Sequence, residues 1–278
     1  MAFLLGHTGL VLTNAPSLAV VGDALSRGGY NVLKVVSGWG LPGGWTRETI
    51  QQAVRIAPTV IVRTRTGDPS LDKRFGGDFA FVDQHRVEAE IYPWYRERPD
   101  LWIELGNEPN AYPLTVRQMH EYAYFLSRSV ERCRVIFPEA LLMAPAMIID
   151  RPNAEQFMAI CRPIFNQCDA IALHAYEWET FAGPVAGRKG ELEQAFAIAG
   201  RLFPQKRWFL SEYGIHGPQL TPAVKGARYA QLLHRRPLPE QLLGASYYHL
   251  CIDGKIQPEY HIYPKGDLGY HRARFEQA

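Results

Sequence analysis

The sequence predicts an α/β fold in which eight parallel strands alternate with helices and close into a (β/α)8 TIM barrel, with residues 1–278 as a single domain. Three observations favour this class. Eight short apolar runs recur along the chain, amphipathic helical patterns stand between them, and no linker divides the composition. The length of 278 residues also suits such a barrel, which commonly needs about 250.

The predicted strands are short apolar runs, rich in β-branched or aromatic residues and bounded by turn residues. In chain order they are Phe3–Gly9, Val32–Ser37, Thr59–Thr64, Leu101–Asn107, Ala140–Pro145, Ala170–His174, Arg207–Glu212 and Gly244–His249. The first run is interrupted by Gly6, His7 and Thr8 and has no basic segment before it. We therefore expect a strand there and not a signal peptide, which leaves a cytoplasmic protein or a trimmed secreted domain open.

Helical patterns occupy the intervals between the strands. The clearest covers Val116–Phe137, where apolar residues recur at spacings of three and four, and Thr115 with Gln118 predicts a capping box at its start. Thr221 followed by Pro222 predicts another helix start. The other predicted helices cover residues 16–28, 46–56, 83–97, 153–166 and 189–203.

The same alternation is compatible with an open, doubly wound sheet. That fold favours a glycine-rich phosphate turn after the first strand, and the segment GHTGL lacks the GxGxxG spacing. The strand count and the chain length therefore favour the closed barrel.

Charge and composition exclude several function classes. The net charge of +2 and the lack of a basic run argue against nucleic acid as a partner, and no run approaches the roughly 20 apolar residues that span a membrane. Cys133, Cys161, Cys168 and Cys251 lack CxxC spacing, so we expect buried free thiols and no metal site among them. We expect a monomer without a cofactor.

Two glutamates stand at carboxyl ends of predicted strands, which line the active-site mouth of a barrel. Glu108 follows the fourth strand within the segment NEPN, and Glu212 closes the seventh. A turn favours Asn and Pro there but has no need of Glu, and an unpaired buried acid is destabilising. Two such acids at one mouth therefore indicate a function.

Further polar and aromatic residues lie near the same strand ends. They are Lys34, Trp39, Arg63, Arg65, His174, Tyr176, Trp178, Tyr247, Tyr248 and His249. His174 and Tyr176 are two residues apart and so share one side of their strand. Structural roles stay open for several members of this set, because a buried cation can simply neutralise an acid and an aromatic ring can be a packing residue.

A pair of carboxylates across a pocket is the equipment of glycoside hydrolysis. One carboxyl group must be protonated to protonate the leaving oxygen, and the other must be ionised to attack the anomeric carbon. In retaining enzymes the two groups lie about 5–5.5 Å apart. We expect this separation between Glu108 and Glu212, and we expect no metal ion between them.

The strand-end residues resemble clan A of the glycoside hydrolases. Asn107-Glu108-Pro109 with Glu212 in the segment SEYG is similar to the two catalytic strand ends of that clan, and HAY at residues 174–176 resembles the His-x-Tyr of its family 5. The segment GYNVLKVVSGW is similar to the strand-two pattern of family 5. The resemblance covers the whole chain at the strand ends and is weak elsewhere.

This resemblance implies a retaining barrel enzyme that acts on a β-linked oligosaccharide or polysaccharide. Glu108 would be the acid/base, Glu212 the nucleophile, and Asn107 the partner of the sugar 2-hydroxyl in the −1 subsite. Tyr176 would bond the nucleophile, and His174 would line the floor. The remaining expected substrate-binding residues are Lys34, Arg63, Trp39, Trp178 and Tyr248.

The chain also departs from the family pattern. Lys34 stands where family 5 has Arg, so Arg63 is a candidate for part of that role, and Tyr247-Tyr248-His249 replaces the usual Trp platform. Two alternative functions stay open: an inactive carbohydrate-binding barrel, which retention of both glutamates disfavours, and a metal-dependent barrel hydrolase. The latter would need a His-x-His near the first strand, and GHTGL has one His only.

Overall fold

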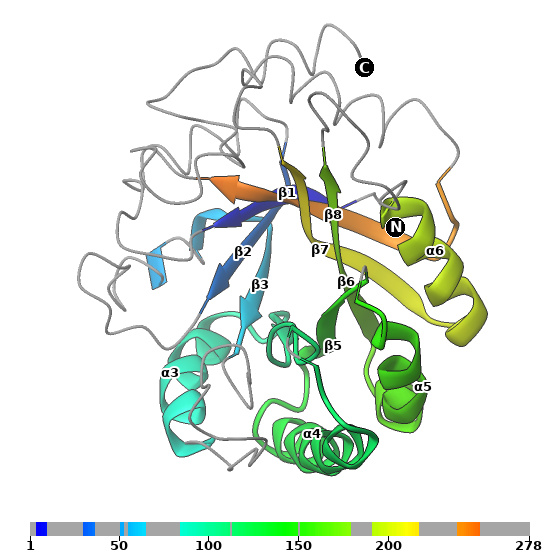
Figure 1. The fold of residues 1–278 in the computed structure, drawn as a ribbon. Helices are drawn as coiled ribbons and strands as arrows, with labels where there is room; N and C mark the ends of the chain where they lie inside the picture. Colours follow the sequence, from blue (N-terminus) through cyan, green and yellow to red (C-terminus); the bar gives the residue numbers. More distant parts are fainter. Residues whose placement is uncertain are drawn as a thin grey trace, which may run out of the picture.

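The computed structural model confirms a closed barrel of eight parallel strands that are hydrogen-bonded in chain order, from β1 to β8 and back to β1 (Figure 1). The structure describes residues 4–9, 30–36, 51–52, 55–64, 84–111, 113–149, 151–178, 191–216 and 238–250. The strands are β1 (Leu4–Gly9), β2 (Val32–Val36), β3 (Thr59–Arg63), β4 (Trp102–Glu104), β5 (Leu141–Ile148), β6 (Ala170–Trp178), β7 (Arg207–His216) and β8 (Leu242–Leu250).

The labelled helices lie outside the barrel in Figure 1. They are α3 (Gln84–Glu97), α4 (Val116–Ile136), α5 (Ala154–Phe165) and α6 (Glu191–Leu202). The predicted capping box is present, because the Gln118 amide donates to Thr115 Oγ1 while the Thr115 amide donates to Gln118 Oε1. None of the described helices has the length and apolar character needed to cross a membrane.

Part of the helix prediction falls outside the described residues. Residues 51–52 and 55–56 are helical, in agreement with the helix predicted over 46–56. The helix predicted over 16–28 and the one that starts at Thr221 lie outside the described ranges.

Alternation of side chains along the strands divides the barrel interior into layers. The layer nearer the amino ends of the strands is an apolar cluster of buried residues, and it includes Val32, Ile61, Trp102, Ala172 and Phe209. Two positions further along their strands, the inward-facing residues are Lys34, Arg63, Glu104 and His174, all buried. The interior therefore changes from apolar to charged toward the carboxyl ends of the strands.

A β-bulge in β7 alters this alternation. Leu210 pairs with Leu173 and Glu212 with His174, so Ser211 is the extra residue in β7. Leu210 and Tyr213 pack in the outer core, whereas Ser211 and Glu212 both contact Lys34 inside the barrel. A bulge re-aims a side chain in this way. Strict alternation from Phe209 would have placed Glu212 outside.

Closure of the barrel depends on Gly244 in β8. Its partner in β1 is Leu4, and a Cβ atom added at Gly244 would lie 1.8 Å from the Leu4 carbonyl oxygen. No side chain fits at that distance, so the first and last strands pair only because residue 244 is glycine.

Several predicted strand ends were wrong. β4 ends at Glu104 and not at Asn107, because the chain turns at Gly106, whose φ of 89° suits glycine. β5 continues past Pro145 to Ile148, since a register shift between Ala144 and Met147 accommodates the missing amide donor. β6 and β7 run on to Trp178 and His216, where their mutual pairing continues.

The described cysteines are buried free thiols, as predicted. Cys133, Cys161 and Cys168 are all buried in the core between barrel and helices. Burial raises the pKa of the Cys161 thiol, and it raises the pKa of Cys168 to about 12. Both thiols therefore stay protonated near neutral pH and behave as apolar core groups. Cys251 lies outside the described residues.

Candidate active site

The loop after β4 places Glu108 at the barrel mouth. The Glu108 amide donates to Ala146 O in β5 at 2.9 Å, and the Ala111 amide donates to Glu108 O at 2.9 Å. Glu108 to Ala111 therefore form a hydrogen-bonded β-turn with Pro109 at its second position, which Pro favours. The buried Asn110 side chain fixes the turn to β5, because it donates to Ile148 O at 2.8 Å and accepts from Ile148 N at 2.9 Å.

Glu108 itself has a strained backbone. Its φ is 43°, and among the described residues it is the non-glycine residue with a positive φ. An L-residue in this region costs roughly 1–2 kcal/mol. Such strain persists where the surrounding structure over-determines it, which is typical of functional sites.

This strain predicts an order of stability between two variants. The free energy of unfolding of Glu108→Gly should be about 1 kcal/mol higher than that of Glu108→Ala, because glycine adopts a positive φ without a Cβ clash. Chemical denaturation measures the difference. The matched control is the exposed Glu131 in α4, where the glycine variant should instead be about 1 kcal/mol less stable than the alanine variant. If the glycine variant is the less stable one at both positions, the backbone of Glu108 is not strained.

Glu212 is held by three side chains from three other strands. Arg63 Nη1 donates to Glu212 Oε1 at 2.6 Å, Lys34 Nζ donates to the same oxygen at 3.3 Å, and the Tyr176 hydroxyl donates to Oε2 at 2.6 Å. Arg63 Nη1 also donates to Asn107 Oδ1 at 2.5 Å. The carboxylate is therefore fixed at both oxygens, and Asn107 is tied to the same cation.

The electrostatics of this pocket favour an ionised Glu212. Burial by itself raises the pKa of this carboxyl group, but electrostatic interactions with His174, Lys34 and Arg63, together with the Tyr176 hydrogen bond, outweigh burial. The net result holds the pKa of Glu212 well below the ordinary carboxyl range. Glu212 is therefore a carboxylate near neutral pH.

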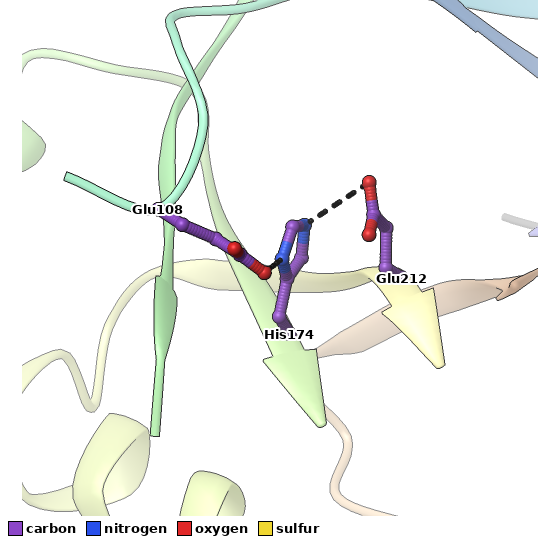
Figure 2. Close-up of side chains that lie close together, drawn as sticks. All are labelled: Glu108, His174 and Glu212. Atoms are coloured by element: carbon purple, nitrogen blue, oxygen red, sulfur yellow. Dashed lines mark hydrogen bonds and ion pairs between the residues drawn. The ribbon is translucent and has the colours of Figure 1, made fainter. Parts of the chain in front are cut away.

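His174 lies between the two glutamates, as Figure 2 shows. A hydrogen bond of 2.7 Å joins its Nδ1 to Glu108 Oε1, and its Nε2 lies 3.7 Å from Glu212 Oε1. One ligand atom from each of Glu108, His174 and Glu212 lies within 4.8 Å of the others. Two carboxyl groups and an imidazole that lie so close together could either transfer protons or hold a metal ion. Experiments must distinguish these two roles.

The structure brings together seven of the residues predicted for the site. They are Lys34, Arg63, Asn107, Glu108, His174, Tyr176 and Glu212. Trp39 lies outside the described residues, and so do the side chains of Trp178 in β6 and Tyr248 in β8. Tyr247 is a core residue, since it is fully buried and packs edge to face against Tyr30 with ring centroids 6.1 Å apart.

Two residues of the charged cluster were missed from the sequence. Glu104 is fully buried at the end of β4 and lies 2.9 Å from Lys34 Nζ, and the Ser211 hydroxyl donates to Glu104 Oε1 at 3.2 Å. Glu104 could have been found by its spacing of two from Trp102, which marks both as inward-facing in an apolar strand. Ser211 carried no such signal, because the bulge in β7 cannot be read from its residues.

Comparison with known proteins finds similarity in three dimensions only. No protein-family model matches the chain, and no curated protein matches it in sequence. Solved structures with the same fold include an endo-β-1,3-glucanase of glycoside hydrolase family 128 from Pseudomonas viridiflava. It is 12% identical with a TM-score of 0.60, and the match covers 98% of this chain and 96% of that one.

Two further structures belong to the same set of neighbours. A broad-specificity family 5 endoglucanase from Clostridium longisporum is 11% identical, with a TM-score of 0.65 and coverage of 99% and 95% of the two chains. An exo-β-1,3-glucanase of family 128 from Blastomyces gilchristii is 14% identical, with a TM-score of 0.57 and coverage of 98% and 97%. The structural neighbours of this chain are thus glycoside hydrolases with the TIM-barrel fold, the class that its strand-end residues resemble.

Proposed function

We propose that this protein is a retaining glycoside hydrolase that cleaves a β-linked O-glycosidic bond. Glu212 attacks the anomeric carbon, the bond to the leaving oxygen breaks, and Glu108 delivers a proton to that oxygen. A water molecule then attacks the same carbon of the glycosyl ester and gives its proton to Glu108, which releases Glu212 as a carboxylate.

One observation carries this proposal: oxygens of Glu108 and Glu212 lie within 4.8 Å of each other at the carboxyl ends of the barrel strands. Retaining enzymes hold their carboxyl groups about 5–5.5 Å apart, whereas inverting enzymes need about 6.5–9.5 Å to admit a water molecule. The geometry therefore favours double displacement. The depressed pKa of Glu212 supports its assignment as the nucleophile.

The neighbouring side chains fit supporting roles. Asn107 accepts from Arg63 through Oδ1, which directs its amide NH2 group toward a hydroxyl acceptor on the sugar. Tyr176 and Arg63 fix Glu212 for attack. Glu108 is only partly buried, with 18% of its side chain exposed, so it can reach a leaving group. The solved neighbours named as glucanases suggest β-glucans as the first substrates to test.

The proposal is tested with a panel of aryl β-glycosides and soluble β-glucans, mannans and xylans. Hydrolysis should release a product that initially has the β configuration at its anomeric carbon. NMR spectra recorded before mutarotation measure this configuration. An initial α product would show inversion and contradict the double displacement. Binding of an oligosaccharide without any product would instead support the inactive carbohydrate-binding barrel.

Activity should not depend on a metal ion. Lys34 Nζ and Arg63 Nη1 lie 3.3 and 2.6 Å from Glu212 Oε1, the oxygen that is 3.7 Å from His174 Nε2, and their charges repel a divalent cation. We expect unchanged kcat/KM after dialysis against EDTA, compared with dialysis against buffer alone. Loss of activity with EDTA and its return with Zn²⁺ or Mn²⁺ would favour the metal-dependent hydrolase.

The acidic limb of the pH profile should respond to Tyr176. In the wild type the pKa of Glu212 is depressed, so the group stays ionised as the pH falls. Tyr176→Phe removes the 2.6 Å hydrogen bond to its carboxylate, which raises the pKa of Glu212 and moves the acidic limb of kcat/KM to higher pH. The exposed Tyr124 provides the control Tyr124→Phe. A limb that stays in place or moves to lower pH would count against Glu212 as the group that must be ionised.

A further inference from the structure

Glu104 is a third carboxylate in the charged cluster, and the chemistry proposed above does not use it. Its side chain is fully buried inside the barrel, so it cannot touch a substrate. Its contacts are Lys34 Nζ at 2.9 Å and the Ser211 hydroxyl at 3.2 Å, with His174 Nε2 at 3.9 Å. Any effect of Glu104 on the reaction must therefore pass through these neighbours.

Lys34 is shared between two carboxylates. Its Nζ lies 2.9 Å from Glu104 Oε2 and 3.3 Å from Glu212 Oε1, and it also donates to the Ser211 carbonyl and hydroxyl oxygens at 3.3 Å. The Lys34 side chain is fully buried. Glu104 is thus the nearer partner of this cation, whereas Arg63, at 2.6 Å, is the nearer partner of Glu212.

The four groups form a balanced set of charges, two cations (Lys34 and Arg63) and two anions (Glu104 and Glu212). When Glu212 becomes a glycosyl ester it loses its charge, and Glu104 is then the anion that remains beside Lys34. A buried cation without a partner is strongly unfavourable. Without Glu104, formation of the ester would remove the charge of Glu212 while Lys34 lacks its nearest anion.

We propose that Glu104 is a positioning residue that acts as the permanent countercharge of Lys34, and that it thereby lets Glu212 give up its charge during formation of the glycosyl ester. This inference rests on the proposed function for its kinetic part and on the structure alone for its charge pairing. Two experiments separate these parts.

The first experiment measures the charge pairing without any substrate. Glu104→Gln and Lys34→Met should each lower Tm by roughly 6–10 °C, since each deprives a buried charge of its nearest partner of opposite sign. The double variant should lose clearly less than the sum, because it removes both charges together. If the Tm loss of the double variant equals the sum of the two single losses, the proposed pairing of Glu104 with Lys34 is wrong. If Glu104→Gln alone fails to fold while the double variant folds, the pairing is supported.

A surface pair provides the matched control for this cycle. Arg117 and Glu121 are one turn apart on α4, 2.8 Å from each other, and largely exposed. The corresponding variants Arg117→Met and Glu121→Gln should shift Tm little and should add, because exposed ion pairs contribute little.

The second experiment resolves the two chemical steps on an aryl β-glycoside that the wild type hydrolyses. Glu104→Gln should lower the rate of ester formation, measured as kcat/KM with an activated leaving group, by roughly tenfold or more. It should not slow hydrolysis of the preformed ester, because that step restores the Glu212 carboxylate. Glu104→Asp keeps the charge and should preserve the wild-type ratio of the two rates.

Equal slowing of both steps, or wild-type kinetics in Glu104→Gln, would overturn the kinetic part. A wild type that forms no glycosyl ester with any aryl glycoside would overturn the proposed function instead. In that case the unfolding cycle still decides whether Glu104 is the countercharge of Lys34.

Discussion

Glu212→Ala is expected to reduce kcat/KM by several orders of magnitude for every substrate, whatever its leaving group. The variant lacks the only carboxylate that Lys34, Arg63 and Tyr176 together hold ionised among the described residues, and no ester can form without it. Added azide fits the space of the missing carboxylate and should displace the leaving group directly. A β-linked substrate would then yield the α-glycosyl azide, which NMR identifies.

The control for this variant is Glu240→Ala, which changes an exposed glutamate just before β8 and should keep full activity. A β-glycosyl azide from Glu212→Ala would reverse the roles of the two glutamates. Unchanged activity in Glu212→Ala would remove Glu212 from the mechanism altogether.

Glu108→Ala should show a loss that depends on the leaving group. Substrates whose leaving oxygen needs a proton should be slowed by several orders of magnitude, whereas activated aryl glycosides, which depart without a proton, should form the ester at a much smaller loss. Azide then attacks that ester without needing base catalysis. The expected product is the β-glycosyl azide, with retained configuration.

The measurement is a plot of log kcat/KM against the pKa of the leaving phenol, which should be steeper in Glu108→Ala than in the wild type. Glu139→Ala, at another exposed position, serves as control and should leave the slope unchanged. Parallel plots for the variant and the wild type would contradict an acid/base role for Glu108.

Much of the architecture could be predicted from local patterns. Each of the eight apolar runs became a strand of the barrel, because a strand that is buried on both faces is apolar over most of its length. The helix over Val116–Ile136 followed from its spacing and its capping box, both local properties of the chain. That the whole chain forms one domain stays a prediction.

Most residues of the candidate site could also be predicted from the sequence, for a topological reason. Parallel strands bring all their carboxyl ends to one side of the barrel, so residues at the ends of separate strands meet although they lie far apart in sequence. Arg63 and Glu212 are 149 positions apart and form an ion pair of 2.6 Å. The sequence by itself thus determined which residue types gather at the mouth.

Tertiary structure alone decided the direction of the Glu212 side chain and the partner of Glu104. Glu212 faces inward because β7 has a bulge at Ser211, and a bulge depends on the pairing of β7 with both neighbouring strands. Glu104 pairs with Lys34 because β2 and β4, which flank β3 in the barrel, both direct these side chains into the interior, although the two residues are 70 positions apart in the chain. Local residue patterns contain neither fact, since strand register and charge pairing are settled only when the barrel closes and excludes water from its interior.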